Sequence, residues 1–382
     1  MKTTRRGFVK SVAWGTAAGA LGGTSLLSNT AGAQTLAAHA SGVYDNGIMQ
    51  LNQNESARGP GPKTMEAIHN HTSKRVGRGY SPDHVNELRQ AIAEEYGLET
   101  GNVQLATGST PLLQGATRAF CSTDRALITA APTYATSEAT ARTIGAPIHG
   151  LVLTNSAHID LEGMAAKAPG AGLVYVCNPN NPSGTVHGPD AIESFVRRVM
   201  AQAPDTYIHI DEAYINYADP GAMQTAVPLV KEFPRVFITR SFSKAHALAG
   251  MRIGYALGHE DTIDAIRSAW GMGDVNMLGA VAALVALKDK EHLEWERREN
   301  NRVKEYVVGA FRQMGYDVPH SHTNHIFVNL GIPASRFREA CLREKVAVGR
   351  DFPPMENTHC RISLGSWEEM QKAVAVFKRV LA

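Results

Sequence analysis

Short, continuous apolar runs alternate along this chain with stretches in which apolar residues recur at helical spacing. The runs have the length and the β-branched and aromatic content of buried strands, and most give way abruptly to polar residues. They cover residues 103–106, 126–128, 173–176, 207–210, 236–238 and 253–257. Strands that are apolar on both faces are typical of a parallel sheet covered by helices on both sides. The pattern therefore predicts an α/β protein with a mainly parallel sheet.

Helical spacing predicts the elements between and after these strands. Ser81 is a predicted helix cap with Pro82 at the first helical position, and an apolar face then runs to Tyr96 before Gly97 ends the helix. A shorter helix is expected at residues 63–70, and a long continuous helical pattern runs from about residue 278 to 310. Beyond it the pattern predicts a smaller α/β domain. Its strands would cover residues 326–330 and 360–364, and its helices residues 335–344 and 367–381.

The first residues differ in composition from the rest of the chain. Arg5 and Arg6 precede a weakly apolar, Gly/Ala-rich segment that ends in the small residues before and at Ala33. This segment resembles a twin-arginine secretion signal, and Ser, Thr and Gly interrupt it too often for a membrane span. We therefore expect cleavage after Ala33 and a periplasmic or otherwise exported protein, with a cytoplasmic location as the alternative. The remaining boundaries predict a linker and N-terminal arm at 34–75, a large domain at 76–285 and a small domain at 286–382.

Composition and charge exclude several classes of protein. Hydrophobic residues make up 43% of the chain and charged residues 19%, and the net charge of +2 comes without clustered basic stretches, so nucleic-acid binding is not expected. The four cysteines lack the spacing of metal ligands and are expected to be buried, although a disulfide is left open. The histidines at 320, 322 and 325 also fit no standard metal spacing, so no metal is expected.

Polar residues with phosphate-binding chemistry follow several predicted strands. Gly108, Ser109 and Thr110 stand where a helix starts, and free N–H groups there attract anions, although an ordinary helix cap has the same sequence. Ser241, Ser243 and Arg252 offer hydroxyl donors and a bidentate cation farther along. Ligands in parallel α/β sheets collect at the carboxyl ends of the strands, where these residues are expected to meet.

Lys244 is the residue that turns this phosphate chemistry into a cofactor hypothesis. It stands between Ser243 and Ala245 rather than among other charges. Such surroundings lower the pKa of an amine by desolvation, and a neutral amine can form a Schiff base with an aldehyde. An aldehyde beside a phosphate describes pyridoxal phosphate. A surface lysine after a core strand is the alternative for Lys244 taken alone.

Four further residues complete a set of partners for that cofactor. Asp211 follows a strand, and a buried carboxylate there needs a cation, which a protonated pyridine nitrogen would supply. Asn181 and Tyr214 could donate hydrogen bonds to a phenolic oxygen on the same ring, and Tyr134 could stack on its face. Each could instead be a turn or packing residue.

Three motifs give the chain a resemblance to a known family. They are Asn-Pro-Asn-Asn-Pro-Ser-Gly at 178–184, Asp-Glu-Ala-Tyr at 211–214, and Ser-Phe-Ser-Lys at 241–244 with an arginine eight residues later. In this order they resemble the fold-type I pyridoxal-phosphate-dependent aminotransferases (class I/II), most closely the histidinol-phosphate aminotransferase subgroup.

The resemblance implies a role for each candidate residue. Lys244 would carry the Schiff base, Asp211 would contact the ring nitrogen, Asn181 and Tyr214 the ring oxygen, and Tyr134 would stack on the ring. The phosphate would be held by Gly108, Ser109, Thr110, Ser241, Ser243 and Arg252, with Tyr80 contributed by the second subunit of a homodimer. Arg361, Arg350 and Asn54 would bind the substrate.

The implied activity is ping-pong transfer of an amino group from an amino acid, or a histidinol-phosphate-like amine, to a 2-oxo acid. Departures from the family pattern at residues 54–57 and 270–276 leave the donor open. A lyase, decarboxylase or racemase on the same fold and an exported protein that binds the cofactor without catalysis are the alternatives.

Overall fold

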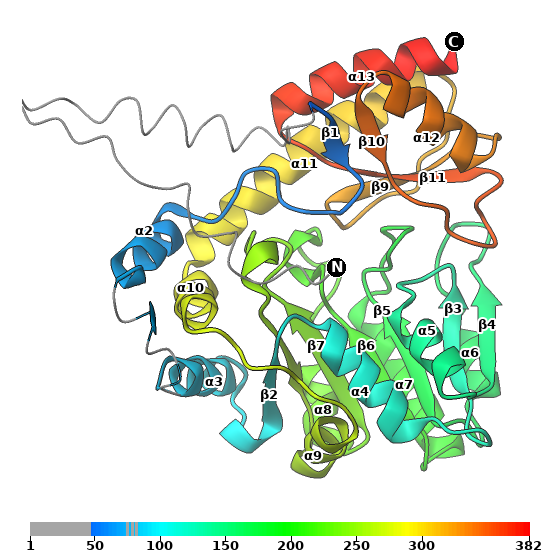
Figure 1. Ribbon diagram of the computed structural model, residues 1–382. Helices are drawn as coiled ribbons and strands as arrows, with labels where there is room; N and C mark the ends of the chain where they lie inside the picture. The colour runs from blue at the N-terminus through cyan, green and yellow to red at the C-terminus, as the bar shows by residue number, and fades with distance from the viewer. Residues whose placement is uncertain (1–46, 74–75, 78–79, 81–82) are drawn as a thin grey trace, which may run out of the picture. The chain divides into compact units, whose positions relative to one another are not determined.

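The computed structural model describes residues 47–382 apart from 74–75, 78–79 and 81–82 (Figure 1). The predicted secretion signal and the predicted helix cap Ser81 lie outside the described residues. Among those that are described, no helix is long and apolar enough to cross a membrane.

The described residues contain a seven-stranded sheet with strand order β2-β8-β7-β6-β5-β3-β4. Its strands are β2 (Val103–Ala106), β3 (Leu127–Ala131), β4 (Ile148–Val152), β5 (Leu173–Cys177), β6 (Tyr207–Asp211), β7 (Val236–Ser241) and β8 (Gly254–Leu257). Strands β3 to β7 pair in parallel, and β8 runs antiparallel to both neighbours. The predicted α/β class with a mainly parallel sheet is therefore confirmed.

Helices cover both faces of this sheet, and the strand residues alternate between two hydrophobic clusters. In β5, Val174 and Val176 join one cluster, and Leu173 and Tyr175 join the other. Both sets are buried because each face has its own layer of helices. The helices are α3 (Asp83–Tyr96), α4 (Thr110–Phe120), α5 (Thr136–Thr143), α6 (Leu161–Lys167), α7 (Pro189–Gln202), α8 (Val227–Glu232), α9 (Glu260–Ala269) and α10 (Met277–Lys288).

A further hydrophobic cluster gathers the last part of the chain. It contains residues of α11 (Lys290–Gln313), α12 (Ala334–Arg343), α13 (Trp367–Leu381), β9 (His325–Asn329), β10 (Val346–Val348) and β11 (His359–Ser363). Strands β9 and β11 pair antiparallel, and β1 (Met49–Leu51) pairs in parallel with β10. The early strand therefore shares a core with the C-terminal elements. The predicted domain boundaries themselves stay predictions.

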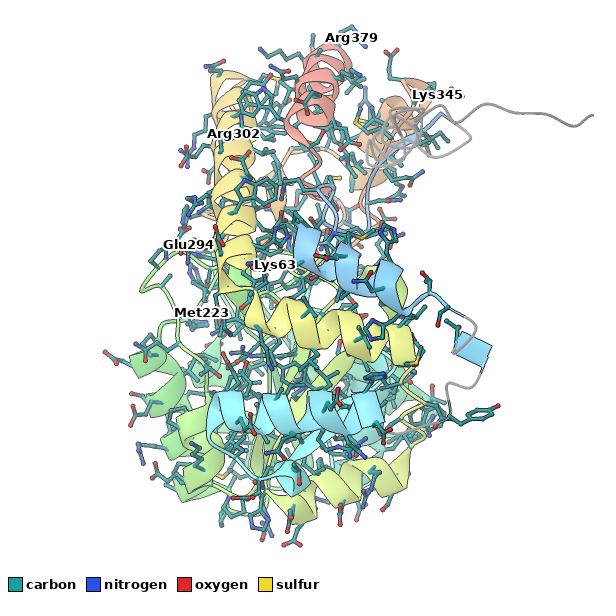
Figure 2. The ribbon with its side chains drawn as sticks, turned by 90° about the vertical axis from the view of Figure 1, so that its left-hand side faces the viewer. Lys63, Met223, Glu294, Arg302, Lys345 and Arg379 are labelled. Atoms are coloured by element: carbon teal, nitrogen blue, oxygen red, sulfur yellow. The ribbon has the colours of Figure 1, made fainter. Side chains whose placement is uncertain are left out.

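The prediction of one continuous helix from about 278 to 310 is wrong. Asp289 interrupts it with backbone angles outside the helical region and separates α10 from α11. The Asp289 carboxylate accepts a hydrogen bond of 3.0 Å from Lys63, so it is held by a partner distant in sequence. Lys63 lies on α2 (Pro62–His71) and is labelled in Figure 2. Apolar periodicity continues across such a break, which is why the sequence pattern did not reveal it.

The strands β1, β4 and β10 were not predicted. Strands β1 and β10 have three residues each, too few for a period to show, and β4 is a half-exposed edge strand. The prediction for the cysteines is confirmed, because all four lie within the described residues and are free and buried.

Candidate active site

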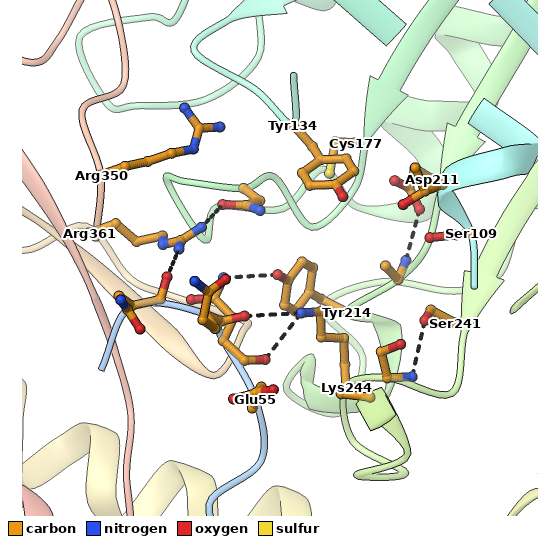
Figure 3. Close-up of a pocket in the computed structure, with 18 of the residues that line it drawn as sticks. Glu55, Ser109, Tyr134, Cys177, Asp211, Tyr214, Ser241, Lys244, Arg350 and Arg361 are labelled. Carbon is orange, nitrogen blue, oxygen red and sulfur yellow. Dashed lines mark hydrogen bonds between the residues drawn. The ribbon is translucent and has the colours of Figure 1, made fainter. Parts of the chain in front are cut away.

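A cavity of about 720 Å³ lies at the carboxyl ends of β5, β6 and β7, beside the start of α4 (Figure 3). Nearly all of the residues predicted from the sequence line it. They are Asn54, Ser109, Thr110, Tyr134, Asn181, Asp211, Tyr214, Ser241, Ser243, Lys244, Arg252, Arg350 and Arg361. Gly108 lies just behind this lining, and Tyr80 does not belong to it.

The phosphate-binding residues form a cradle that depends on two glycines. A Cβ on Gly108, whose φ is +84°, would stand 2.3 Å from a guanidinium nitrogen of Arg252. A Cβ on Gly254 would stand 2.5 Å from the backbone nitrogen of Ser109. Real Cβ atoms do not approach so closely, so both positions require glycine. Ser109 precedes the first turn of α4 without making a side-chain cap bond in the described structure, which leaves its hydroxyl for a ligand.

Ser243 and Arg252 complete this cradle from the other side. Arg252 has φ +56°, a left-handed conformation that costs a non-glycine residue free energy and is retained mainly where function requires it. Its guanidinium donates to the Ala249 carbonyl at 3.0 Å, and the Ser241 hydroxyl accepts from the Ser243 N–H at 3.0 Å. An anion here would meet one positive charge, several hydroxyls and a helix N-terminus.

Lys244 points into the cavity with its amine near other cationic groups. Burial, the main cause, together with the charge of Arg361 lowers the pKa of Lys244 to about 8. The amine donates to the Asn54 carbonyl at 3.2 Å and lies 5.5 Å from the centre of the Tyr214 ring. A substantial fraction of this amine is therefore neutral near physiological pH, as a Schiff-base nucleophile requires.

The lowered pKa makes a testable prediction about the apoprotein. Only the neutral amine attacks an aldehyde, so the rate of pyridoxal phosphate uptake should rise with pH and level off above about 8. Stopped-flow absorbance on apoprotein at a series of pH values measures this rate. A rate that keeps rising toward pH 10, as for an ordinary lysine, would contradict the lowered pKa.

Asp211 presents a buried carboxylate at the end of β6. It accepts hydrogen bonds from the Tyr175 hydroxyl at 3.0 Å and the Thr239 hydroxyl at 3.1 Å. Burial nevertheless raises the pKa of Asp211 to about 6, because these donors are neutral. A cationic ligand atom would restore the charged form, so the carboxylate suits a protonated ring nitrogen.

The predicted substrate residues lie on the side of the cavity formed by β11 and its neighbours. Arg361 is 7% exposed and donates to the Asn181 side-chain oxygen at 2.9 Å and to the Asn52 carbonyl at 2.5 Å. Arg350 is exposed, and its guanidinium lies 4.4 Å from the centre of the Phe352 ring. The assignment of individual roles to these residues stays a prediction.

Several lining residues and their supports were missed by the sequence analysis. Glu55, Arg338 and Asp351 line the cavity, and Arg338 pairs with Asp351 at 2.6 Å. Behind Asp211, His209 bonds the Thr239 hydroxyl at 2.7 Å. Alternation along β6 could have revealed His209, because it points to the same side of the sheet as Asp211. No comparable signal marks the other three, which lie in loops or on a helix facing the cavity.

The histidine-rich segment contributes to two different places. His320 and His322 lie with Asp219, and the His320 ring bonds the Asp219 carboxylate at 2.7 Å. These are residue types that bind metals, but the cationic Lys304 acts on the same carboxylate, so we do not propose a metal site there. His325 is fully buried beside Tyr214, their rings 5.3 Å apart.

The residues of this cavity fit pyridoxal phosphate. The glycine-dependent cradle suits a phosphate, the Asp211 carboxylate suits a cationic ring nitrogen, and the Lys244 amine, with its lowered pKa, lines the same cavity. Tyr134 and Tyr214 face the same space, where a planar ring would lie (Figure 3). Fold and site together define an enzyme dependent on pyridoxal phosphate.

Comparison with known proteins shows the family. The model of the family "aminotransferase class I and II" matches residues 46–377. The chain belongs to this family, so the predicted fold type I, the cofactor and the aminotransferase activity are confirmed.

Relatives within the family are similar over nearly their whole length. The chain is 34% identical over 348 residues to histidinol-phosphate aminotransferase 2 of Methylococcus capsulatus, covering 87% of this chain and 90% of that one. It is 31% identical over 350 residues to histidinol-phosphate aminotransferase 2 of Pseudomonas aeruginosa, covering 89% and 91%. The crystal structure of histidinol-phosphate aminotransferase from Sinorhizobium meliloti, in complex with pyridoxal-5'-phosphate, superposes with a TM-score of 0.78 at 26% identity, covering 87% and 90%.

Proposed function

We propose that this aminotransferase takes its amino group from a donor that carries an anionic group, either an amino acid or a phosphorylated amine such as histidinol phosphate, and passes it to a 2-oxo acid. The observation that carries this proposal is Arg361, a buried guanidinium on the wall of the cavity that holds Lys244. A buried cation there would pair with the anionic group of the donor. The relatives named for histidinol phosphate support the phosphorylated alternative.

The proposed chemistry assigns one task to each of the main residues. Pyridoxal phosphate, when bound, supplies the electrophilic carbon and the electron-withdrawing ring. Lys244, once the donor amine has displaced it, would remove the proton from the donor Cα with Nζ and deliver it to the cofactor carbon that had carried the aldehyde, so that the donor leaves as an oxo compound. Asp211 favours the protonated ring nitrogen, and Arg361 orients the donor so that the Cα–H bond faces Lys244. Product must leave before the oxo acid enters, because both use the same cavity.

A panel of amino donors tests this function. Purified holoenzyme is mixed with histidinol phosphate, acidic, aromatic and aliphatic amino acids, each in turn, and the bound cofactor's visible absorbance is followed. The expected result is loss of the band with an anionic or phosphorylated donor, formation of the matching oxo product, and recovery of the band when a 2-oxo acid is added. Release of carbon dioxide or of an unoxidised racemate instead of an oxo product would overturn the proposal.

A homodimer with Tyr80 acting in trans is also a proposal. Tyr80 is fully exposed and is not part of the lining of its own subunit's cavity. A fully exposed aromatic residue is unusual in an isolated subunit and suits a contact with a second copy. The resemblance implies that its hydroxyl would contact the phosphate bound by that copy.

Mixing two impaired variants tests directly whether Tyr80 acts in trans. Tyr80→Phe and Lys244→Ala subunits, unfolded and refolded together, should recover part of the activity that each lacks alone. Recovery is expected because one site of the mixed dimer would combine an intact Lys244 with an intact Tyr80. If each subunit uses its own Tyr80, no site in the mixed dimer has both residues intact. The activity of the mixture should then be no higher than the separate activities of the Lys244→Ala and Tyr80→Phe proteins predict.

Export by the twin-arginine route is proposed from the sequence of residues 1–33, which lie outside the described structure. Ser109, Ser241 and Arg252 come from distant segments, so the cofactor site exists only in a folded chain. A cofactor made in the cytoplasm would therefore have to be loaded before export, and the twin-arginine route carries folded proteins.

Changing Arg5 and Arg6 together to lysine should hold active, cofactor-loaded precursor in the cytoplasm. Cell fractionation followed by absorbance and activity assays measures this, with the unchanged chain as the control. Normal export of the double variant, or uncut unchanged chain in the cytoplasm, would contradict the proposed signal and favour a cytoplasmic enzyme.

A further inference from the structure

Asn54 occupies an unusual position next to the cavity. It follows β1 in the chain, its φ is +56°, and only 1% of it is exposed. Asparagine tolerates this left-handed conformation better than most residues, but the strain still needs a reason. The reason lies in its amide group, whose hydrogen bonds all reach residues far away in the sequence.

Ser363 of β11 holds the oxygen end of this amide. The Asn54 backbone N–H donates to the Ser363 hydroxyl at 2.9 Å, and that hydroxyl donates to Asn54 Oδ1 at 2.6 Å. The serine therefore accepts one bond and returns one. This reciprocal pair orients the amide so that Nδ2 points away from β11.

The nitrogen end of the amide lies against two rings. Asn54 Nδ2 is 2.9 Å from the Tyr214 hydroxyl and 3.0 Å from His325 Nδ1. An NH₂ group has two hydrogens, so it can donate to both at once. Every hydrogen-bonding atom of the Asn54 side chain is then in use.

His325 supports this orientation of the amide. Burial lowers the pKa of His325 well below its usual value, so the ring is neutral. The amide nitrogen of Asn54 can only donate, and it lies 3.0 Å from Nδ1. Nδ1 of the neutral ring is therefore the acceptor, and the ring hydrogen is assigned to Nε2.

The direction of the Tyr214 hydroxyl hydrogen follows from these contacts. Burial raises the pKa of Tyr214, so its hydroxyl stays protonated. Because the hydroxyl oxygen accepts from Asn54, its own hydrogen points elsewhere, and Tyr214 lines the cavity. We propose that Asn54, held by Ser363 and His325, is a positioning residue that turns the Tyr214 O–H toward the phenolic oxygen of bound pyridoxal phosphate.

This proposal rests on the cofactor assignment and goes beyond the substrate-binding role that the sequence suggested for Asn54. It also gives β11 two roles at the site. Ser363 stands two residues after Arg361 on β11, so the strand that carries the proposed donor-binding arginine also orients the amide that directs Tyr214.

A double-mutant cycle between Asn54 and Tyr214 tests the proposal. Asn54→Gly removes the amide, while it keeps the positive φ and the backbone carbonyl that accepts from Lys244. Reconstituted Asn54→Gly, Tyr214→Phe and double-variant proteins are titrated with pyridoxal phosphate, and the visible absorbance of the bound cofactor is followed against pH.

Asn54→Gly alone should weaken cofactor binding about tenfold, the typical cost of one hydrogen bond to a charged oxygen. The pH at which the bound cofactor's absorbance titrates should rise, because the phenolic oxygen loses a donor that stabilises its negative charge. In the Tyr214→Phe background the same substitution should weaken cofactor binding by no more than about twofold and should leave the titration of the absorbance at the same pH. The reason is that the Tyr214 hydroxyl, through which Asn54 acts, is already gone.

Two further variants separate positioning from a general loss of structure. Asn54→Asp keeps the shape but offers an acceptor to Tyr214, so the hydroxyl should turn away and the titration should shift farther than with glycine. Ser363→Ala should shift it in the same direction, and Ser363→Thr, which keeps the hydroxyl, should restore it. If the Asn54→Gly protein does not fold, the Ser363 pair carries the test.

Equal effects of Asn54→Gly with and without the Tyr214 hydroxyl would overturn the proposal, as would an unshifted titration in the Ser363→Ala protein. Failure of the unchanged chain to bind pyridoxal phosphate would instead overturn the cofactor assignment on which the proposal rests.

Discussion

Replacing Lys244 with alanine should lower transamination by at least about 10⁴-fold, since it removes both the nucleophile and the general base. The structure supports this size of effect, because the amine lies in the cavity with a pKa lowered to about 8 by burial. Single-turnover kinetics with excess enzyme would measure the loss of the chemical step directly. The protein should still bind pyridoxal phosphate through the phosphate cradle, with the absorbance of the free aldehyde.

Lys304 provides a matched control for this variant. Burial lowers its pKa to about 8 as well, but Lys304 lies outside the cavity lining and its amine bonds the Ser321 carbonyl. A Lys304→Met protein that folds should therefore keep the chemical step of the unchanged enzyme. If Lys244→Ala retained full turnover, Lys244 would not be the catalytic lysine.

Replacing Arg361 with lysine should weaken donor binding, by at most the loss of about 2–5 kcal/mol that follows when one partner of a desolvated, hydrogen-bonded charge pair is removed altogether. Lysine keeps the charge but cannot form the planar, bidentate contact of a guanidinium. Arg361 is 7% exposed and already bonds Asn181 and Asn52, so its position is fixed before a donor arrives. The loss should appear mainly in KM if Arg361 binds ground state and transition state alike.

Arg302→Lys is the control for this substitution. Arg361 lies 4.9 Å from the centre of the Phe352 ring, and Arg302 likewise lies 4.2 Å from the centre of the Trp367 ring, but Arg302 does not line the cavity. Its replacement should leave KM and kcat unchanged. Unaltered kinetics of the Arg361→Lys enzyme with every donor that the unchanged enzyme accepts would remove Arg361 from the donor site.

Local sequence determined the sheet and the residues at its carboxyl edge. The strands ending at Cys177, Asp211 and Ser241 are short apolar runs that must be buried on both faces. Parallel pairing brings their carboxyl ends to one edge of the sheet, independently of the conformation of the loops. Glycine, serine, lysine and arginine near that edge together match the phosphate and the aldehyde of one cofactor. The cofactor site was therefore predictable before its distances were known.

Only the tertiary structure decided which groups support that edge. Asn54 and Ser363 are 309 positions apart in the chain, and neither has a local pattern that names the other as partner. The same holds for Gly254, which is required because the Gly108–Ser109 peptide lies directly against it, and for Asp289, which breaks a helix that periodicity predicts to continue.

The physical reason is the range of the interactions involved. Strand and helix preferences act over a few residues and leave a period in the sequence. The direction of a hydroxyl hydrogen depends on atoms that the packing of the whole chain brings within 3 Å. The same is true of the lack of space for a Cβ at a glycine. The sequence by itself thus specified the fold class and the chemical groups of the site. The packing of β9, β11 and Asn54, which follows β1, near the Tyr214 hydroxyl specified how those groups are oriented.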